Sequence, residues 1–139
     1  MTFTSVAEMK RRRIESDWAP AAIAPYSQAI MHGDVVFCSG QIGLERAGAK
    51  MVAGGVEAQT RRALENLRAV LGQAGMSLDS VVKTTIFLTD LGDFDVVNSV
   101  YSEYFNPPYP ARSTVQAAAL PRGARVEIEA IAIRDDGTA

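Results

Sequence analysis

Reactive side chains are scarce in this sequence, which holds one cysteine, Cys38, and one histidine, His32. A single cysteine excludes an intrachain disulfide and a thiolate metal cage, and a single histidine excludes a two-histidine zinc site. Cys38 lies in an apolar stretch and His32 in a turn-like His-Gly-Asp sequence, so they make no convincing nucleophile–base pair. The chemistry that remains is that of arginine, carboxylate, hydroxyl and backbone groups.

Three charged side chains stand where β-like segments begin or continue. Arg112 opens one such segment, and Glu127 and Glu129 alternate in the last one. A guanidinium can hold a carboxylate through two parallel hydrogen bonds, and a carboxylate can take a proton from water. Spacing alone favours the interpretation of Arg112 as a solvated arginine at the start of a strand. The pattern alone also does not distinguish Glu127 from Glu129.

Short β-branched runs and two amphipathic segments must position these side chains. The turn residues at 32–34 favour a hairpin between two short strands, and four glycines between residues 43 and 55 favour a loop. The predicted order of strands and helices is ββαβαββ. The strands are expected over residues 28–31, 35–42, 81–89, 113–119 and 125–133, and the helices over residues 56–74 and 93–105.

The economical arrangement of these elements is a single α+β domain, with two helices on one face of a mixed sheet. The last strand alternates, with Val126 and Ile128 on one face and Glu127, Glu129 and Ile131 on the other. The chain has no third helix to cover this second face. A partner subunit is its simplest cover.

Length and charge exclude several classes of protein. The chain has 139 residues, which fits one domain, and a net charge of −2, which argues against nucleic-acid binding despite the basic run at residues 10–13. No apolar stretch reaches the roughly 18 residues of a membrane span. The first residues lack the apolar core of a secretory signal, so we expect a cytoplasmic protein. We expect a flexible N-terminal extension over residues 1–13 and the domain over residues 14–136.

Several short motifs follow one another in a characteristic order from about residue 14 to residue 134. They are APAAIAPYSQA at 19–29, VFCSGQI at 36–42, EAQTR at 57–61, LENL at 64–67, VKTT at 82–85, PARSTV at 110–115 and VEIEA at 126–130. Together they resemble the Rid (reactive intermediate deaminase) family, also known as YjgF or L-PSP.

This resemblance implies a chorismate-mutase-like fold and a homotrimer with its sites in clefts between subunits. It also implies hydrolysis of 2-imino acids, such as 2-iminopropanoate and 2-iminobutanoate, to 2-keto acids and ammonia, with no cofactor and no metal. Arg112 resembles the residue that binds the substrate carboxylate, and Glu127 the acid that positions water. The further pocket positions implied by the resemblance are Tyr26, Ser39, Gly40, Asn98 and Thr114.

The sequence departs from the family pattern near the proposed site. Thr114 stands where many members have cysteine, and Gln116 and Ala119 stand where glutamate and arginine are frequent. These differences leave the substrate open, so deamination of an aminomuconate-type enamine is one alternative. A non-catalytic trimer that binds keto acids is a second, although a binder needs the arginine and not the acid. A ribonuclease is disfavoured by the acidic charge balance and the single histidine.

Overall fold

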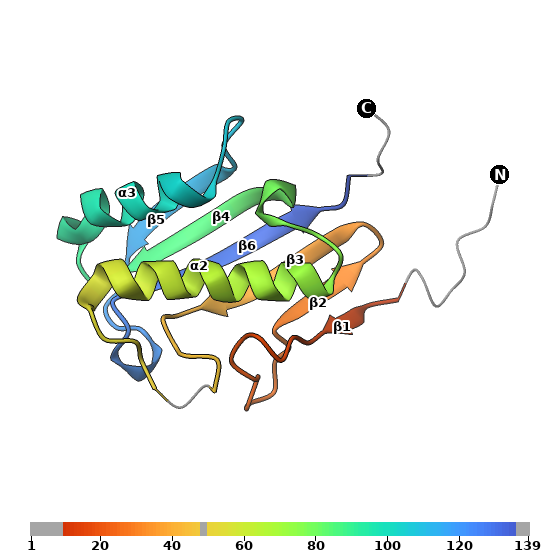
Figure 1. Ribbon diagram of the computed structural model, residues 1–139, viewed down its shortest axis with the longest axis horizontal. Helices are drawn as coiled ribbons and strands as arrows, with labels where there is room; N and C mark the ends of the chain where they lie inside the picture. Colours follow the sequence, from red (N-terminus) through yellow and green to blue (C-terminus); the bar gives the residue numbers. More distant parts are fainter. Residues whose placement is uncertain (1–9, 48–49, 136–139) are drawn as a thin grey trace.

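The computed structural model describes residues 10–47 and 50–135, which form one mixed sheet with helices against it (Figure 1). The strands lie in the order β1-β2-β3-β6-β4-β5. Neighbouring strands are antiparallel except for β4 and β5, which are parallel. The strand bounds are β1 (Arg12–Ile14), β2 (Ala29–His32), β3 (Val35–Gln41), β4 (Val81–Leu88), β5 (Ala111–Gln116) and β6 (Val126–Ile133).

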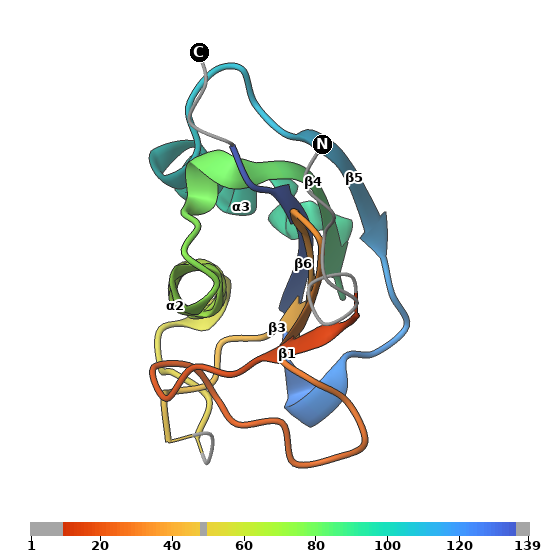
Figure 2. The ribbon, with the colours of Figure 1, turned by 90° about the vertical axis from the view of Figure 1, so that its right-hand side faces the viewer.

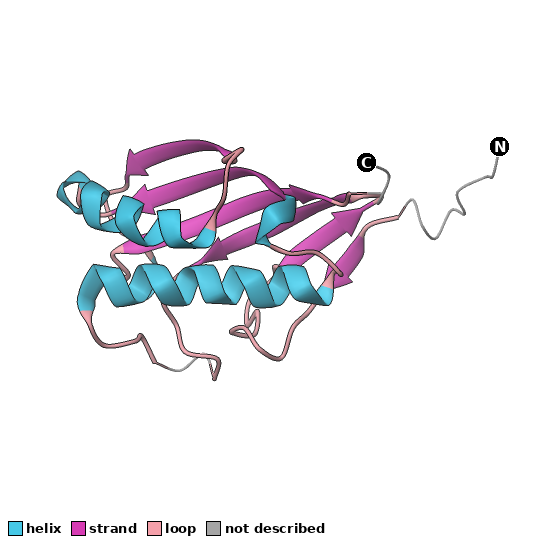
Figure 3. Cartoon of the chain, turned by 45° about the horizontal axis from the view of Figure 1, so that its top comes forward, coloured by secondary structure: helices cyan, strands magenta, loops and turns pink. Residues whose placement is uncertain are grey.

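Two α-helices, α2 (Gly55–Gln73) and α3 (Phe94–Tyr104), lie on the same face of the sheet, as Figure 2 shows. Figure 3 shows them side by side across the strands. Three short 3₁₀ turns complete the described elements: η1 (Leu78–Ser80), η2 (Leu91–Asp93) and η3 (Pro121–Gly123). The predicted α+β class, with a mixed sheet and two helices on one face, is confirmed.

The core forms between α2 and the sheet because each presents one apolar face, at the helical period in α2 and by alternation in the strands. Leu64, Leu67 and Leu71 recur at helical spacing and are fully buried. In β6 the alternation is equally clear, since Val126 and Ile128 are buried while Glu129 is exposed. None of the helices in the described ranges is long and apolar enough to cross a membrane.

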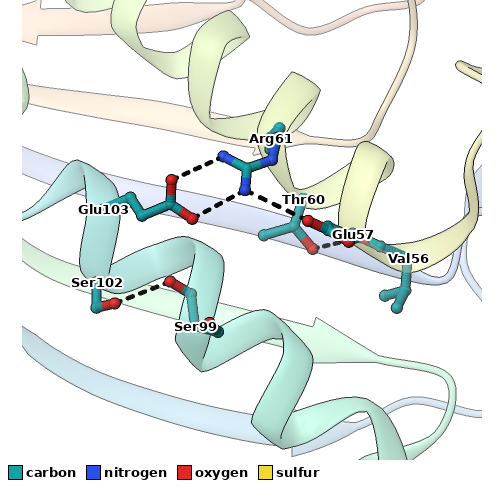
Figure 4. Close-up of polar contacts among 7 residues, drawn as sticks. All are labelled: Val56, Glu57, Thr60, Arg61, Ser99, Ser102 and Glu103. Atoms are coloured by element: carbon teal, nitrogen blue, oxygen red, sulfur yellow. Dashed lines mark hydrogen bonds and ion pairs between the residues drawn. The ribbon is translucent and has the colours of Figure 1, made fainter.

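An ion pair joins the two helices on their outer side. The Arg61 guanidinium of α2 binds the Glu103 carboxylate of α3 with contacts of 2.8 and 3.1 Å, and it also reaches Glu57 at 3.4 Å (Figure 4). This contact fixes the side of α3 that faces α2. The remaining side of α3 faces β4 and β5, where Arg112 lies.

Three details differ from the sequence expectation. Strand β1 was not predicted, because its Arg-Arg-Ile sequence carries only one apolar residue, Ile14; charged residues are typical of an edge strand. Strand β5 ends at Gln116 rather than at residue 119. Phe94, whose place in the apolar pattern of residues 93–105 predicts core packing, is 37% exposed at the start of α3. Residues 1–9 of the expected extension lie outside the described residues, while Arg12 and Arg13 belong to β1.

The sheet face away from the helices is open among the described residues. Phe37 of β3, Val115 of β5 and Ile133 of β6 each have about half of their surface exposed on it. Lys83 and Glu129 lie among them and line a shallow cavity of about 290 Å³. An apolar sheet face of this kind is typical of a surface that another subunit covers.

Candidate active site

Glu127 lies on the open face of β6, at a point where the pairing of β6 with the neighbouring strand β3 is irregular. The register between β3 and β6 shifts between Cys38 and Gln41. Gly40 sits in this irregular part, and a Cβ added there would stand within 2.8 Å of the Glu127 carboxyl carbon. Glycine at this position is therefore what allows the Glu127 side chain to lie against the backbone of β3.

A cavity of about 460 Å³ opens beside Glu127. It brings together four of the predicted site residues: Tyr26, Ser39, Gly40 and Glu127. The Ser39 hydroxyl donates to the Ser27 carbonyl at 2.6 Å, which fixes its direction and leaves its lone pairs able to accept. Tyr26 is 54% exposed at the cavity edge.

The environment of Glu127 favours its protonated form. Partial burial raises the pKa of the Glu127 carboxyl, and the negative charge of Glu129, two residues along the same face, raises it further. A carboxylate with a raised pKa is a stronger base than an exposed one. Glu127 is thus suited to accept a proton from water.

Arg112 lies in a different part of the molecule, at the outer strand β5. Its guanidinium carbon lies 5.0 Å from the ring centre of Tyr101 and 5.5 Å from that of Phe94, both on α3. Asn98 and Arg112 line a cavity of about 340 Å³ together with Tyr101. No ion pair joins Arg112 to a carboxylate within the described part of the chain. The arginine therefore lies on aromatic rings with its N–H groups available to an anion.

Thr114 follows Arg112 on the same face of β5, since side chains two residues apart point the same way. It pairs with Ile86 of β4. Its hydroxyl oxygen is buried and has no hydrogen-bond partner among residues 10–47 and 50–135. A buried hydroxyl without a partner loses its hydrogen bonds to water and gains none in return, which costs free energy of folding.

The structure places the predicted residues in two separate groups. Arg112 pairs with Thr84 of β4, whose side chain is buried under α3, so Arg112 points to the helix side of the sheet. Glu127 pairs with Phe87, three residues further along β4, and points to the open side. From strand spacing the two backbones are about 14 Å apart. Arg112 and Glu127 of one chain therefore cannot contact the same small molecule.

Comparison with known proteins identifies the family. Residues 16–134 match the family model described as Endoribonuclease L-PSP. The chain belongs to this family. The relative DfrA of Myxococcus xanthus is 56% identical over 127 residues, which are 90% of this chain and 97% of DfrA.

Two further relatives connect this L-PSP family member to the Rid name. The 2-iminobutanoate/2-iminopropanoate deaminase of Homo sapiens is 44% identical over 129 residues, which are 93% of this chain and 94% of the human protein. The crystal structure of YyfA, a Rid family protein of Yersinia pestis, has a TM-score of 0.87 and 47% identity, covering 90% of this chain and all of YyfA. The predicted membership of the Rid/YjgF/L-PSP family is confirmed.

The isolated reactive side chains of this family member match their sequence interpretation. Burial raises the pKa of the Cys38 thiol to about 12, so it stays protonated and unreactive at neutral pH. His32 is exposed at the end of β2. Within the described ranges, no three side chains of histidine, cysteine, aspartate or glutamate gather as a metal site would require.

The sequence alone did not connect Phe94 and Tyr101 with Arg112. Both aromatic residues fit the apolar stripe of α3, and that pattern predicts core packing only. Their contact with the arginine depends on where β5 pairs with β4, which no local pattern specifies. A signal was present only in the unusual number of aromatic residues in one short helix, Phe94, Tyr101 and Tyr104.

Proposed function

We propose that this protein hydrolyses small 2-imino acids, 2-iminopropanoate and 2-iminobutanoate, to 2-keto acids and ammonia in the cytoplasm, without a cofactor. The observation that carries the proposal is Arg112, a partly buried guanidinium that lies on aromatic rings and has no carboxylate partner among the described residues. Such a group fits a ligand that brings its own carboxylate. The deaminase name of the human relative agrees with this ligand.

In this mechanism Arg112 binds the substrate carboxylate through two parallel hydrogen bonds. The bidentate contact fixes both the position and the plane of the carboxylate, and therefore of the neighbouring C=N carbon. Asn98 lines the same cavity as Arg112, so in this mechanism its side-chain amide hydrogen-bonds to the substrate.

Glu127 acts on water. The water oxygen forms a bond to the iminium carbon while the π electrons move to nitrogen, and the released proton goes to the Glu127 carboxylate. Glu127 then returns this proton to the nitrogen. The C–N bond breaks as the hydroxyl oxygen becomes the carbonyl and gives up its own proton to the released ammonia. General acid–base help of this kind contributes roughly 10²–10⁴-fold to a rate.

The remaining predicted residues complete the water side of the site. Tyr26, Ser39 and Gly40 share the cavity with Glu127. The Ser39 hydroxyl can accept a hydrogen bond from the attacking water, and Tyr26 can bond to the imine nitrogen or the carboxylate. Gly40 provides the space for the Glu127 side chain.

We propose further that the active sites lie between subunits of a homotrimer with the chorismate-mutase-like arrangement. Arg112 and Glu127 of one chain point to opposite faces of the sheet, so a complete site needs Arg112 from one subunit and Glu127 from another. The half-exposed apolar residues of the open face, Phe37, Val115 and Ile133, supply a surface for such contacts.

The test uses an amino-acid oxidase to generate 2-iminopropanoate and semicarbazide to trap it. We expect the wild-type protein to reduce the semicarbazone signal and Arg112→Ala to abolish both this effect and the binding of 2-ketobutyrate. Arg68→Ala is the matched control, because Arg68 also lies over a tyrosine ring but is paired with Glu65. A folded Arg112→Ala protein that retains full activity would refute the carboxylate-binding role.

Glu127→Gln separates catalysis from binding. We expect it to keep 2-ketobutyrate affinity within about two-fold while losing roughly 10²-fold or more in kcat. Glu129→Gln, on the same strand and face, should retain kcat at alkaline pH. If the wild-type trimer binds keto acids but leaves the semicarbazone signal unchanged, the protein is a ligand-binding protein and not a deaminase.

A further inference from the structure

We infer that Tyr101 is a positioning residue for Arg112. A hydrogen bond between its hydroxyl and that of Thr84 holds the Tyr101 ring in place. The ring in turn sets the plane of the Arg112 guanidinium, so that its N–H edge faces the substrate carboxylate. This inference rests on the proposed role of Arg112. It assigns a function to a residue that the sequence pattern places only in the core of the molecule.

The ring of Tyr101 is a rigid support. Tyr101 is 5% exposed, and its ring stacks on that of Phe105 with the centroids 4.4 Å apart and the planes at 29°. The guanidinium carbon of Arg112 lies over the ring, 5.0 Å from its centre. A cation at this distance is attracted to the ring face, and desolvation by partial burial strengthens the attraction.

The hydroxyl of Tyr101 fixes the ring to the strand beside Arg112. Its oxygen lies 2.8 Å from the Thr84 hydroxyl oxygen, and Thr84 is fully buried. Thr84 is also the residue that pairs with Arg112 in the parallel β4–β5 ladder. Thr84 therefore contacts both parts of this arrangement: it pairs with the backbone of Arg112, and its hydroxyl bonds to the ring that supports the Arg112 side chain.

An aromatic support suits this arginine better than a carboxylate does. Arg68 shows the alternative on the same pair of helices: its guanidinium carbon lies 5.1 Å from the ring centre of Tyr104, but its Nη1 donates to both carboxylate oxygens of Glu65 at 3.0 and 3.1 Å. Arg112 has a comparable ring contact, but it forms no ion pair with a carboxylate among the described residues. A ring face attracts the guanidinium without occupying the N–H edge that a substrate needs.

Tyr101 also remains neutral in this position. Burial raises the pKa of its phenol, and this effect outweighs the opposing influence of the Thr84 bond and the Arg112 charge. Because the pKa of an ordinary tyrosine is already about 10, the raised pKa keeps the Tyr101 phenol protonated at neutral pH. Tyr101 therefore does not itself titrate as part of the reaction.

The test measures the dissociation constant of 2-ketobutyrate by calorimetry, together with KM and kcat for imine hydrolysis. We expect Tyr101→Leu to raise the dissociation constant and KM by roughly 5- to 30-fold with kcat nearly unchanged, because the support acts on carboxylate binding and not on water. Tyr101→Phe, which keeps the ring, should recover most of the affinity. The matched control Tyr104→Leu removes the corresponding ring under Arg68 and should leave both constants within two-fold.

Two further comparisons separate a positioning role of Tyr101 from a simple loss of fold stability. Tyr101→Phe and Thr84→Val remove the same hydroxyl bond from its two ends, so both should raise KM by a similar small factor, about 2- to 5-fold. In an Arg112→Lys background, Tyr101→Leu should have a smaller effect, because an ammonium has no plane to orient. The first of these comparisons decides the question even if Tyr101→Leu does not fold.

The possible failures are distinct. If Arg112→Ala binds 2-ketobutyrate as tightly as the wild type, the proposed function itself is wrong. If Arg112→Ala loses binding while Tyr101→Leu does not, only the positioning role is wrong. Equal losses in Tyr101→Leu and Tyr104→Leu, or equal effects of Tyr101→Leu with Arg112 and with Arg112→Lys, would assign Tyr101 a purely structural role.

Discussion

The ionised form of Glu127 is destabilised, because part of its surface is removed from water and another carboxylate lies on the same face of the strand. Both influences raise the pKa of its carboxyl, burial more than Glu129. In the proposed mechanism the ionised form is the active base. The catalysed rate should therefore fall as the pH drops through this raised pKa.

Replacement of Glu129 tests this reasoning without touching the site. Glu129→Gln removes the neighbouring negative charge, which lowers the pKa of Glu127 and moves the acidic limb of the kcat/KM profile to lower pH. Because burial persists, the pKa does not return to that of an exposed glutamate. The measurement is imine hydrolysis from pH 4 to pH 8, corrected at each pH for the uncatalysed reaction. An acidic limb that stays in place, or moves to higher pH, would mean that the limb does not belong to Glu127.

Sequence reasoning at this scale identified side-chain types and not their surroundings. The apolar context of Cys38 already predicted a buried, unreactive thiol, and the structure agrees. Nothing local separated Glu127 from Glu129, since both alternate on the same strand face. The difference lies in Gly40 on a neighbouring strand, 87 positions earlier in the sequence, and only the resemblance to a family indicated it.

Strand β3 contributes to the site through its irregular pairing more than through any side chain. The register shift between Cys38 and Gln41 places Gly40 against the Glu127 carboxylate. A methyl group at Gly40 would occupy the space of the carboxyl group, so Glu127 would have to turn away from the strand. We expect Gly40→Ala to lower kcat by roughly 10- to 100-fold, since small displacements of a catalytic group cost that much.

The control for this change is a glycine on another element. Gly72 lies near the end of α2, and a Cβ there would meet no atom within 4 Å. Gly72→Ala should therefore keep full activity and stabilise the fold by up to about 1 kcal/mol, measured by thermal or denaturant unfolding. Full activity in Gly40→Ala would show that Glu127 does not need its position against β3.

Most elements were predictable because their apolar residues follow a clear period. Strand β6 alternates strictly, and α2 repeats leucines at helical spacing. Strand β5 has no such pattern: its residues are exposed or half-buried throughout, so alternation could not say which side faces the helices. That side follows from the parallel pairing of Arg112 with Thr84, a long-range contact. The same pairing explains why Tyr101 was assigned only to the core.

At the scale of the whole molecule, the two faces of the sheet carry different residues of the proposed site. The helix side carries Arg112 and Asn98 on its outer strand and helix, and the open side carries Glu127. A single copy holds both halves of a site about 14 Å apart and facing in opposite directions. Association of identical copies is the simplest way to bring unlike halves together, since in a closed ring every interface joins one of each.

This arrangement predicts that two inactive variants restore activity when their subunits mix. In the proposed homotrimer, Arg112→Ala and Glu127→Gln each remove one half of every site. After unfolding and refolding together in equal amounts, a site regains both halves when a subunit with Arg112 meets one with Glu127 in the right order, which happens at roughly one site in four. We therefore expect about a quarter of the wild-type specific activity. The control is Arg112→Ala refolded with the double variant Arg112→Ala/Glu127→Gln, which contains no intact arginine and should stay inactive. If mass measurement shows mixed trimers without any recovery, Arg112 and Glu127 do not act in one shared site, and the inter-subunit mechanism is wrong.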